Sequence, residues 1–290
     1  MSDQWSHPGA LDRKHCGSKH HESSCVVIMS YLKSFLTYFL RRPFPLETRL
    51  LRFMATRYAI RLPYQDVPPY AAGEDMRAPS GILNRSGMIR LAFEFMAGNL
   101  MSGDYFEFGC WGGRTFRMAF EHHKVHFEGK MQFWLFDSFR GLPALGPIDQ
   151  HPKWKQGDFC TSLEDWRRIA TEAGIPQESY SLIVGYYDDT LTAERAASLA
   201  SRTKAGVVFI DCDLYQSARK VLDFIRPLLQ QGTVLCFDDF YCFNGRPDRG
   251  EQLAIKEFLR EHGEVTLVDY VNFGWHGKSF LVHLQEREPS

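Results

Sequence analysis

Two pairs of aspartates each follow a short apolar run in the second half of the sequence. Asp211 and Asp213 follow the run VVFI, and Asp238 and Asp239 follow the run VLCF. If these runs are neighbouring parallel strands, four carboxylates meet in a small volume, which is costly unless a cation or protons compensate them. Hard oxygen ligands suit Mg²⁺, Mn²⁺ or Ca²⁺. The pattern therefore predicts a divalent metal site, against the alternative of separate turn and cap aspartates.

A glycine-rich segment, EFGCWGG at 107–113, follows an earlier apolar run. Glycines let a backbone approach a ligand closely, and the helix expected to follow offers free N–H groups at its N-terminus. The glycine spacing differs from the GxGxxG of dinucleotide sites. An acidic residue two positions before the first glycine instead favours a ligand that joins a nucleoside to an amino acid. The alternative is a plain tight turn.

Asp137 ends the next apolar run. A carboxylate at this position can accept hydrogen bonds from both ribose hydroxyls, so Asp137 and the glycine segment together favour a nucleoside cofactor. Two later segments would flank an adenine, although a simple loop is the more common interpretation of each. They are Gly157-Asp158-Phe159 and Gly185-Tyr186-Tyr187-Asp188-Asp189.

Short apolar runs alternate with helical segments from residue 102 onward. The runs lie at 105–108, 133–136, 182–184, 207–210, 234–237, 265–268 and 280–282. Helices are predicted between them at 162–173, 217–229 and 251–262. Such alternation predicts an α/β fold with a mostly parallel sheet covered on both faces. Only a turn separates the last two runs, which predicts a hairpin that adds an antiparallel strand. Ligands of such sheets bind at the carboxyl ends of the strands, where the polar segments above fall.

The first hundred residues are organised differently. Residues 1–25 are polar and aperiodic, and we expect a disordered tail. Its histidines and cysteines could alternatively bind a metal: His15, Cys16, His20, His21 and Cys25. Residues 26–100 are predicted to be a helical region that serves as a lid or an oligomer interface. Residues 101–290 then form the cofactor-binding domain.

Within the helical region, helices are expected at 26–42, 46–58 and 83–100. The first could lie on a membrane surface, but a packing or subunit-interface helix is favoured, so a homo-oligomer is expected.

The amino-acid composition further limits the class of protein. The 290 residues carry a net charge of −1 and are 44% hydrophobic, which excludes a mostly disordered chain and argues against a nucleic-acid binder that relies on a basic surface. The seven cysteines are widely spaced without a CxxC motif, which favours a reducing compartment over a disulfide framework. No apolar run reaches membrane-span length, and no signal-peptide pattern opens the sequence. We therefore expect a cytoplasmic location.

Four segments in order resemble motifs of the TylF-type macrocin O-methyltransferase family: EFGCWGG, FDSFRGLP, IDCDLYQS and FDDF. The segment RGEQLAIKEF resembles the helix that follows the last motif, and the resemblance covers roughly residues 75–285. It implies a Rossmann-like class I methyltransferase fold with a seven-stranded sheet. It also implies S-adenosyl-L-methionine as cofactor, Mg²⁺ or Mn²⁺, and methylation of a hydroxyl on a small-molecule acceptor, a sugar or a glycosylated natural product.

The resemblance further implies roles for individual residues. Asp211, Asp238 and Asp239 would bind the metal ion, and Asp213 would be the general base. The cofactor would be held by Glu107, Phe108, Gly109, Cys110, Trp111, Gly112, Thr115, Asp137, Ser138, Phe139, Asp158, Phe159, Gly185, Tyr186 and Asp211. Cys212 and Phe240 depart from the family's usual small residue and tyrosine.

Two other functions compete with this interpretation. Asp211-Cys212-Asp213 fits the DxD motif of a metal-dependent glycosyltransferase, although the glycine segment and Asp137 fit an adenosyl ligand better. The second is a cofactor-binding partner protein without transferase activity, against which the full set of four aspartates argues.

Overall fold

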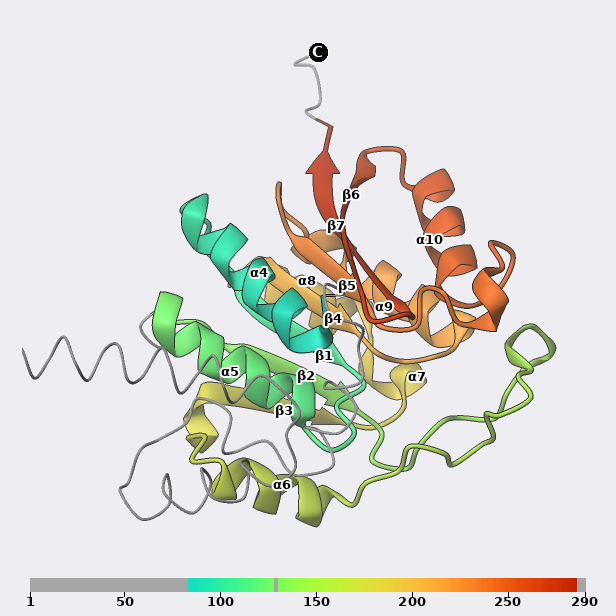
Figure 1. Ribbon diagram of the computed structural model, residues 1–290, viewed down its shortest axis with the longest axis horizontal. Helices are drawn as coiled ribbons and strands as arrows, with labels where there is room; N and C mark the ends of the chain where they lie inside the picture. Colours follow the sequence, from blue (N-terminus) through green and yellow to red (C-terminus); the bar gives the residue numbers. More distant parts are fainter. Residues whose placement is uncertain (1–82, 128–129, 286–290) are drawn as a thin grey trace, which may run out of the picture. The chain divides into compact units, whose positions relative to one another are not determined.

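The computed structural model describes residues 83–127 and 130–285, and a seven-stranded sheet forms its centre (Figure 1). The strands are β1 (Asp104–Phe108), β2 (Phe133–Asp137), β3 (Tyr180–Val184), β4 (Ala205–Ile210), β5 (Val234–Phe237), β6 (Val265–Phe273) and β7 (Gly277–Leu284). Their order is β3-β2-β1-β4-β5-β7-β6. The first five pair in parallel, and β7 is antiparallel to both β5 and β6. The predicted parallel sheet with an antiparallel hairpin strand is confirmed.

The α-helices in the described part of the chain are α4 (Arg85–Gly98), α5 (Arg114–His126), α6 (Leu163–Glu172), α7 (Tyr187–Thr190), α8 (Ala193–Ala200), α9 (Tyr215–Ile225) and α10 (Gly250–Glu261). Short 3₁₀ turns lie at Pro147–Asp149, Gln177–Ser179, Arg226–Leu228 and Phe243–Gly245. The predicted helix at 162–173 is α6, and the Ser162 hydroxyl caps it by accepting a hydrogen bond from the Asp165 backbone N–H (3.0 Å). The sequence analysis did not predict α7 and α8.

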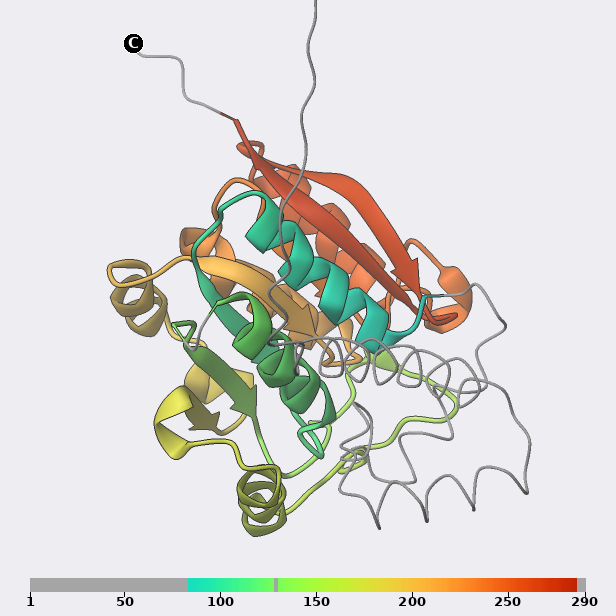
Figure 2. The ribbon, with the colours of Figure 1, turned by 60° about the vertical axis from the view of Figure 1, so that its left-hand side comes forward.

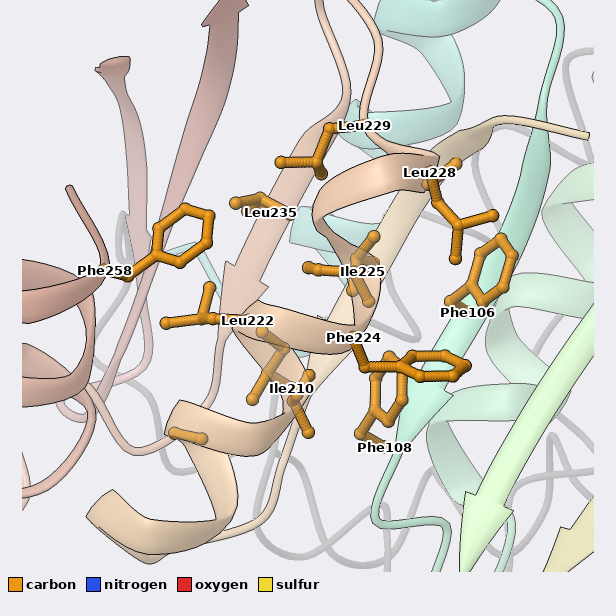
Figure 3. Close-up of a cluster of buried hydrophobic side chains, with 14 of the residues drawn as sticks. Phe106, Phe108, Ile210, Leu222, Phe224, Ile225, Leu228, Leu229, Leu235 and Phe258 are labelled. Carbon is orange, nitrogen blue, oxygen red and sulfur yellow. The ribbon is translucent and has the colours of Figure 1, made fainter. Parts of the chain in front are cut away.

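The central strands are buried on both faces because alternate side chains belong to two different clusters. Phe106 and Phe108 of β1 pack with Leu222 and Ile225 of α9, and Phe258 of α10 joins the same cluster (Figure 3). This layer also includes α8. Continuous apolar runs, rather than alternating ones, therefore encode these strands.

Helices α4, α5 and α6 cover the opposite face (Figure 2). Tyr105 of β1, the residue before Phe106, packs in this second cluster with Phe93 of α4 and Phe116 of α5. The Asn84 side chain caps α4 by accepting a hydrogen bond from the Gly87 backbone N–H (2.8 Å). Helix α4 thus begins at Arg85, whose side chain reaches Asp211 and Asp238 at the carboxyl ends of β4 and β5.

Several predicted elements lie outside the described residues. They are the tail 1–25 with its histidines and cysteines, and the helices 26–42 and 46–58. The boundary at residue 100 stays a prediction. None of the helices described by the structure is long and apolar enough to cross a bilayer.

Candidate active site

The chain order of the strands reverses between β1 and β4, which lie side by side at the centre of the sheet. From β1 the chain continues to β2 on one side, and from β4 it continues to β5 on the other. The crevice at the carboxyl ends of such strands is the usual ligand site of an open α/β sheet. The glycine segment follows β1 here, and the two aspartate pairs follow β4 and β5.

The glycine segment turns tightly because Gly109 adopts φ +91° and touches the chain after β4. A Cβ atom at this position would lie 1.7 Å from the Asp211 carbonyl oxygen. Only glycine therefore fits, and the requirement comes from the neighbouring strand rather than from a ligand. Gly113, with φ +66°, then leads into the first turn of α5.

Asp137 at the end of β2 holds the glycine segment in place. Its Oδ2 accepts hydrogen bonds from the backbone N–H groups of Cys110 (2.7 Å) and Trp111 (2.9 Å). Its Oδ1 accepts one from the Phe139 backbone N–H (2.7 Å). A carboxylate offers about four lone-pair positions, so these three bonds leave about one position for a ribose hydroxyl, fewer than the predicted contact with both hydroxyls needs.

A cavity of about 770 Å³ opens over these loops. The predicted cofactor residues that line it are Gly109, Trp111, Asp137, Ser138, Phe159, Gly185, Tyr186 and Asp211. The predicted base Asp213 and the other two predicted metal ligands, Asp238 and Asp239, line the same cavity. The structure thus brings eight of the fifteen predicted cofactor residues, the predicted base and the three predicted metal ligands to a single space.

The other predicted cofactor residues lie behind or beside this surface. Phe108 and Cys110 are buried in the core, and Phe139 packs against Trp166. Asp158 accepts a hydrogen bond from the Lys155 backbone N–H (2.8 Å), which closes a turn in its own loop. The remaining three are Glu107, Gly112 and Thr115, and the cavity wall includes none of them.

Glu107 is buried beneath the glycine segment, with 1% of its surface exposed. The Tyr105 hydroxyl donates a hydrogen bond to its Oε2 (2.6 Å). Burial raises the pKa of Glu107 to about 8, although this hydrogen bond opposes the shift. At neutral pH Glu107 is therefore mostly a neutral acid that supports the loop from below.

Asp211, Asp238 and Asp239 form a compact group of carboxylates. One oxygen from each lies within 4.8 Å of the other two. Burial, together with the charge of Asp238, raises the pKa of Asp211 well above its usual range. Burial is also the main reason why the pKa of Asp213 is raised, and the nearby charge of Asp239 adds to it. The group therefore favours bound cations or protons.

The arrangement fits a divalent cation. Within the described chain, Asp238 Oδ1 and Asp239 Oδ2 are buried and have no hydrogen-bond partner. Buried carboxylate oxygens without partners are unfavourable unless a cation binds them. Two oxygens on opposite sides of a bound Mg²⁺ or Ca²⁺ lie roughly 4 to 5 Å apart, which agrees with the size of the group.

Arg85 is a component of this group that the sequence analysis missed. Its Nη2 pairs with Asp238 Oδ2, and its Nη1 lies 3.2 Å from Asp211 Oδ2. Arg85 is the first residue of α4 and lies 153 positions before Asp238. No local sequence pattern connects the two.

Glu251 and His276 support the backbone next to these aspartates. Glu251, buried at the start of α10, accepts a hydrogen bond from the Asp239 backbone N–H (3.0 Å). The His276 Nδ1 atom lies 2.5 Å from the Asp238 carbonyl oxygen, which can only accept, so Nδ1 carries the proton. His276 therefore helps to position Asp238 from the hairpin turn.

The far wall of the cavity is aromatic. His151 and Trp154 stack with ring centroids 4.2 Å apart, and Phe243 meets Trp154 edge-on at 5.1 Å. Trp275 of the hairpin turn also lines the cavity and is 76% exposed. This wall comes from the loops 138–162 and 238–249 and from the turn between β6 and β7.

Comparison with solved structures identifies the fold class. The chain superimposes on the crystal structure of the calicheamicin methyltransferase CalS11 with a TM-score of 0.58 and 18% identity, covering 94% of this chain and 99% of the other. The sheet order and the antiparallel β7 belong to the class I methyltransferase fold.

Residues 80–275 match the family model for macrocin-O-methyltransferase (TylF), and the chain belongs to this family. One relative is the 8-demethyl-8-(2,3-dimethoxy-alpha-L-rhamnosyl)-tetracenomycin-C 4'-O-methyltransferase of Streptomyces olivaceus, 25% identical over 54% of this chain and 60% of the relative. Another is the mycinamicin III 3''-O-methyltransferase of Micromonospora griseorubida, 26% identical over 60% of this chain and 68% of the relative. The chain thus spans only 60% of the length of the Streptomyces olivaceus protein.

Proposed function

We propose that this chain is an S-adenosyl-L-methionine-dependent, divalent-metal-dependent O-methyltransferase that methylates a hydroxyl of a sugar or glycoside. One observation carries the proposal. The glycine segment held by Asp137 and the carboxylate group of Asp211, Asp238 and Asp239 border the same cavity, together with Asp213. A cofactor site, a metal site and a base are then available to a single bound acceptor.

Asp137 and the glycine segment would hold the cofactor, with Gly185 and Tyr186 beside its adenine. S-adenosyl-L-methionine, when bound, supplies an electrophilic methyl group on a sulfonium. The chain itself contributes position, because transfer requires the acceptor oxygen in line with that carbon at close range. Gly109 keeps the cofactor loop against the backbone of Asp211. The proposed cofactor site and the proposed metal site therefore stay at a fixed distance from each other.

Asp211, Asp238 and Asp239 would hold the metal ion. A divalent cation, when bound, lowers the pKa of a nearby alcohol and orients it. Asp213 adopts φ +60° after the buried Cys212 and lines the cavity, where it can accept the hydroxyl proton. Burial raises the pKa of Asp213, which strengthens it as a base.

The acceptor would bind against the aromatic wall. Flat apolar rings such as Trp154 and Trp275 suit the C–H faces of a sugar or the apolar body of a glycosylated natural product. Two relatives are named as methyltransferases of a rhamnosyl-tetracenomycin and of mycinamicin III, which supports a glycosidic acceptor. The family and the fold favour this function over a DxD glycosyltransferase.

Homo-oligomerisation and a cytoplasmic location are part of the same proposal. The cysteines that the structure describes are unpaired, which suits a reducing compartment. Light scattering of the purified chain tests the oligomeric state.

Isothermal titration with S-adenosyl-L-methionine and S-adenosyl-L-homocysteine, with and without Mg²⁺, tests the proposed function. We expect micromolar binding. The absence of binding under both conditions would contradict the proposal, and titration of UDP-sugars with Mn²⁺ would then test the glycosyltransferase alternative.

A further inference from the structure

Arg85 is a protein cation fixed inside the proposed metal site. Its side chain is only 20% exposed and touches two of the three carboxylates. Its Nη1 also donates a hydrogen bond to the Thr115 hydroxyl (3.1 Å), and its guanidinium carbon lies 5.6 Å from the centre of the Phe209 ring. These contacts hold the guanidinium in one place instead of leaving it free in solvent.

The two carboxylate oxygens of Asp238 have different surroundings. Oδ2 pairs with Arg85, whereas Oδ1 is buried without a partner. Asp239 is divided in the same way, because its Oδ1 accepts a hydrogen bond from the Cys242 thiol (3.3 Å) and its Oδ2 has no partner. The unpartnered oxygens are thus available to a cation, while Arg85 pairs with the other oxygen of Asp238 and with Asp211.

The charges of the three carboxylates and of Arg85 determine how strongly a metal ion can bind here. Asp211, Asp238 and Asp239 carry three negative charges when ionised, and Arg85 supplies one positive charge. A divalent ion would complete neutrality, but it would bind within a few ångströms of the guanidinium. Like charges at such separations repel strongly where water is largely excluded.

We propose that Arg85 is a built-in competitor of the metal ion. It holds Asp211 and Asp238 in place when no metal is bound, and it weakens their affinity for a divalent cation so that the ion stays exchangeable. The inference rests on the proposed function, since it assumes that the carboxylate group takes a metal ion.

The start of helix α4, which carries Arg85, also contacts the hairpin turn of the site. The neighbouring Leu83 carbonyl accepts a hydrogen bond from the Gly274 backbone N–H (2.8 Å) in the hairpin turn that carries Trp275 and His276. The start of α4, the hairpin turn and Asp238 are therefore tied together, so that movement of Arg85 would reach the aromatic wall.

Mn²⁺ binding measured directly by electron paramagnetic resonance and by calorimetry tests the proposal without an activity assay. We expect Arg85→Gln to lower the Kd for Mn²⁺ at least tenfold, because it removes the competing charge. Arg85→Lys keeps the charge and should stay within threefold of the wild type. Arg90→Gln removes one charge from the exposed side of the same helix, where Arg90 pairs with Glu94 in a solvent-exposed contact, and should also stay within threefold.

Removing Arg85 leaves buried carboxylates without a counter-charge, and Arg85→Gln could fail to fold. The double variant Arg85→Gln/Asp211→Asn removes one charge of each sign and avoids this difficulty. We expect it to bind Mn²⁺ at least tenfold more tightly than Asp211→Asn alone.

Unchanged or weaker Mn²⁺ binding in both Arg85→Gln backgrounds would overturn the proposal. The absence of Mn²⁺ binding in the wild type and in every variant would overturn it as well. Titration of the same samples with S-adenosyl-L-methionine distinguishes a failure of this inference from a failure of the proposed function. If the wild type binds the cofactor but Arg85→Gln does not tighten Mn²⁺ binding, only the role of Arg85 is rejected. If the wild type does not bind the cofactor, the proposed function is rejected.

Discussion

The carboxylate of Asp149 caps helix α9 at Tyr215, 66 positions further along the chain. Its Oδ1 accepts a hydrogen bond from the Tyr215 backbone N–H (2.7 Å), and its Oδ2 lies 3.4 Å from the Gln216 backbone N. Leu214 occupies the cap position and has no side-chain acceptor. A residue of the loop 138–162 thus replaces the usual local cap. Because the same loop carries His151 and Trp154, Asp149 also fixes the aromatic wall.

We expect Asp149→Ala to lower the free energy of unfolding by about 1–2 kcal/mol, as for the loss of a helix cap, and to weaken acceptor binding. Denaturant unfolding measures the first effect, and the KM for an acceptor measures the second. Asp149→Asn keeps one acceptor oxygen and should show a smaller loss. Cofactor affinity should stay within twofold, and a larger change would contradict this localised role.

Asp137→Ala should abolish measurable cofactor binding. The substitution removes the acceptor of three backbone N–H groups that shape the cofactor loop, and unsatisfied donors of this kind cost about 1–3 kcal/mol each when buried. Calorimetry with S-adenosyl-L-homocysteine measures the loss. Asp137→Asn retains one oxygen and should bind with intermediate affinity; binding by Asp137→Ala at the wild-type level would contradict the assignment.

Asp213→Asn should lower kcat at least 10²-fold, since loss of a general base typically costs that much. Cofactor binding should remain nearly unchanged, because no hydrogen bond described in the structure joins Asp213 to the cofactor loop. Single-turnover kinetics with a glycoside acceptor measures the step. Near-normal turnover would exclude Asp213 as the base.

Glu107 predicts a pH dependence of stability. Its pKa is raised by burial to about 8 from an ordinary value of 4.5. The folded state therefore holds this proton more tightly than the unfolded state does, and stability is lost as the pH rises from about 4.5 to 8. At about 1.4 kcal/mol per pH unit, the loss is at most about 5 kcal/mol.

Glu107→Gln removes this titration and keeps an acceptor for the Tyr105 hydroxyl. We expect the variant and the wild type to unfold at similar temperatures at pH 5, and the variant to be several degrees more stable at pH 8. Thermal unfolding across this pH range makes the comparison, and parallel curves for the two proteins would show that Glu107 is not a neutral acid.

Local patterns predicted the strands well because the central strands are buried on both faces. Each predicted apolar run lies in an observed strand, and the aspartates after β4 and β5 meet as expected. Helix α8 was missed although Thr192 caps it locally through the Arg195 backbone N–H (3.2 Å), so its capping residue could have indicated it.

Arg85 and Asp149 could not be found in the same way. Each acts on a partner far along the chain, and neither lies in a distinctive local motif. An arginine at the start of an amphipathic helix and an aspartate in a loop are ordinary surface residues by sequence. Their roles follow only from packing that brings α4 and the loop 138–162 to the ends of the strands.

The contact between Gly109 and the Asp211 carbonyl has a consequence for how the family could acquire new substrates. Any side chain at Gly109 would collide with the backbone after β4. A substitution there would therefore disrupt the proposed cofactor site and the proposed metal site together. The aromatic wall is carried by separate loops. Laboratory evolution toward a new acceptor should therefore accumulate changes at the wall residues of 138–162, 238–249 and the turn with Trp275. Asp149, the predicted cofactor and metal residues, and the contact of Gly109 with Asp211 should stay invariant.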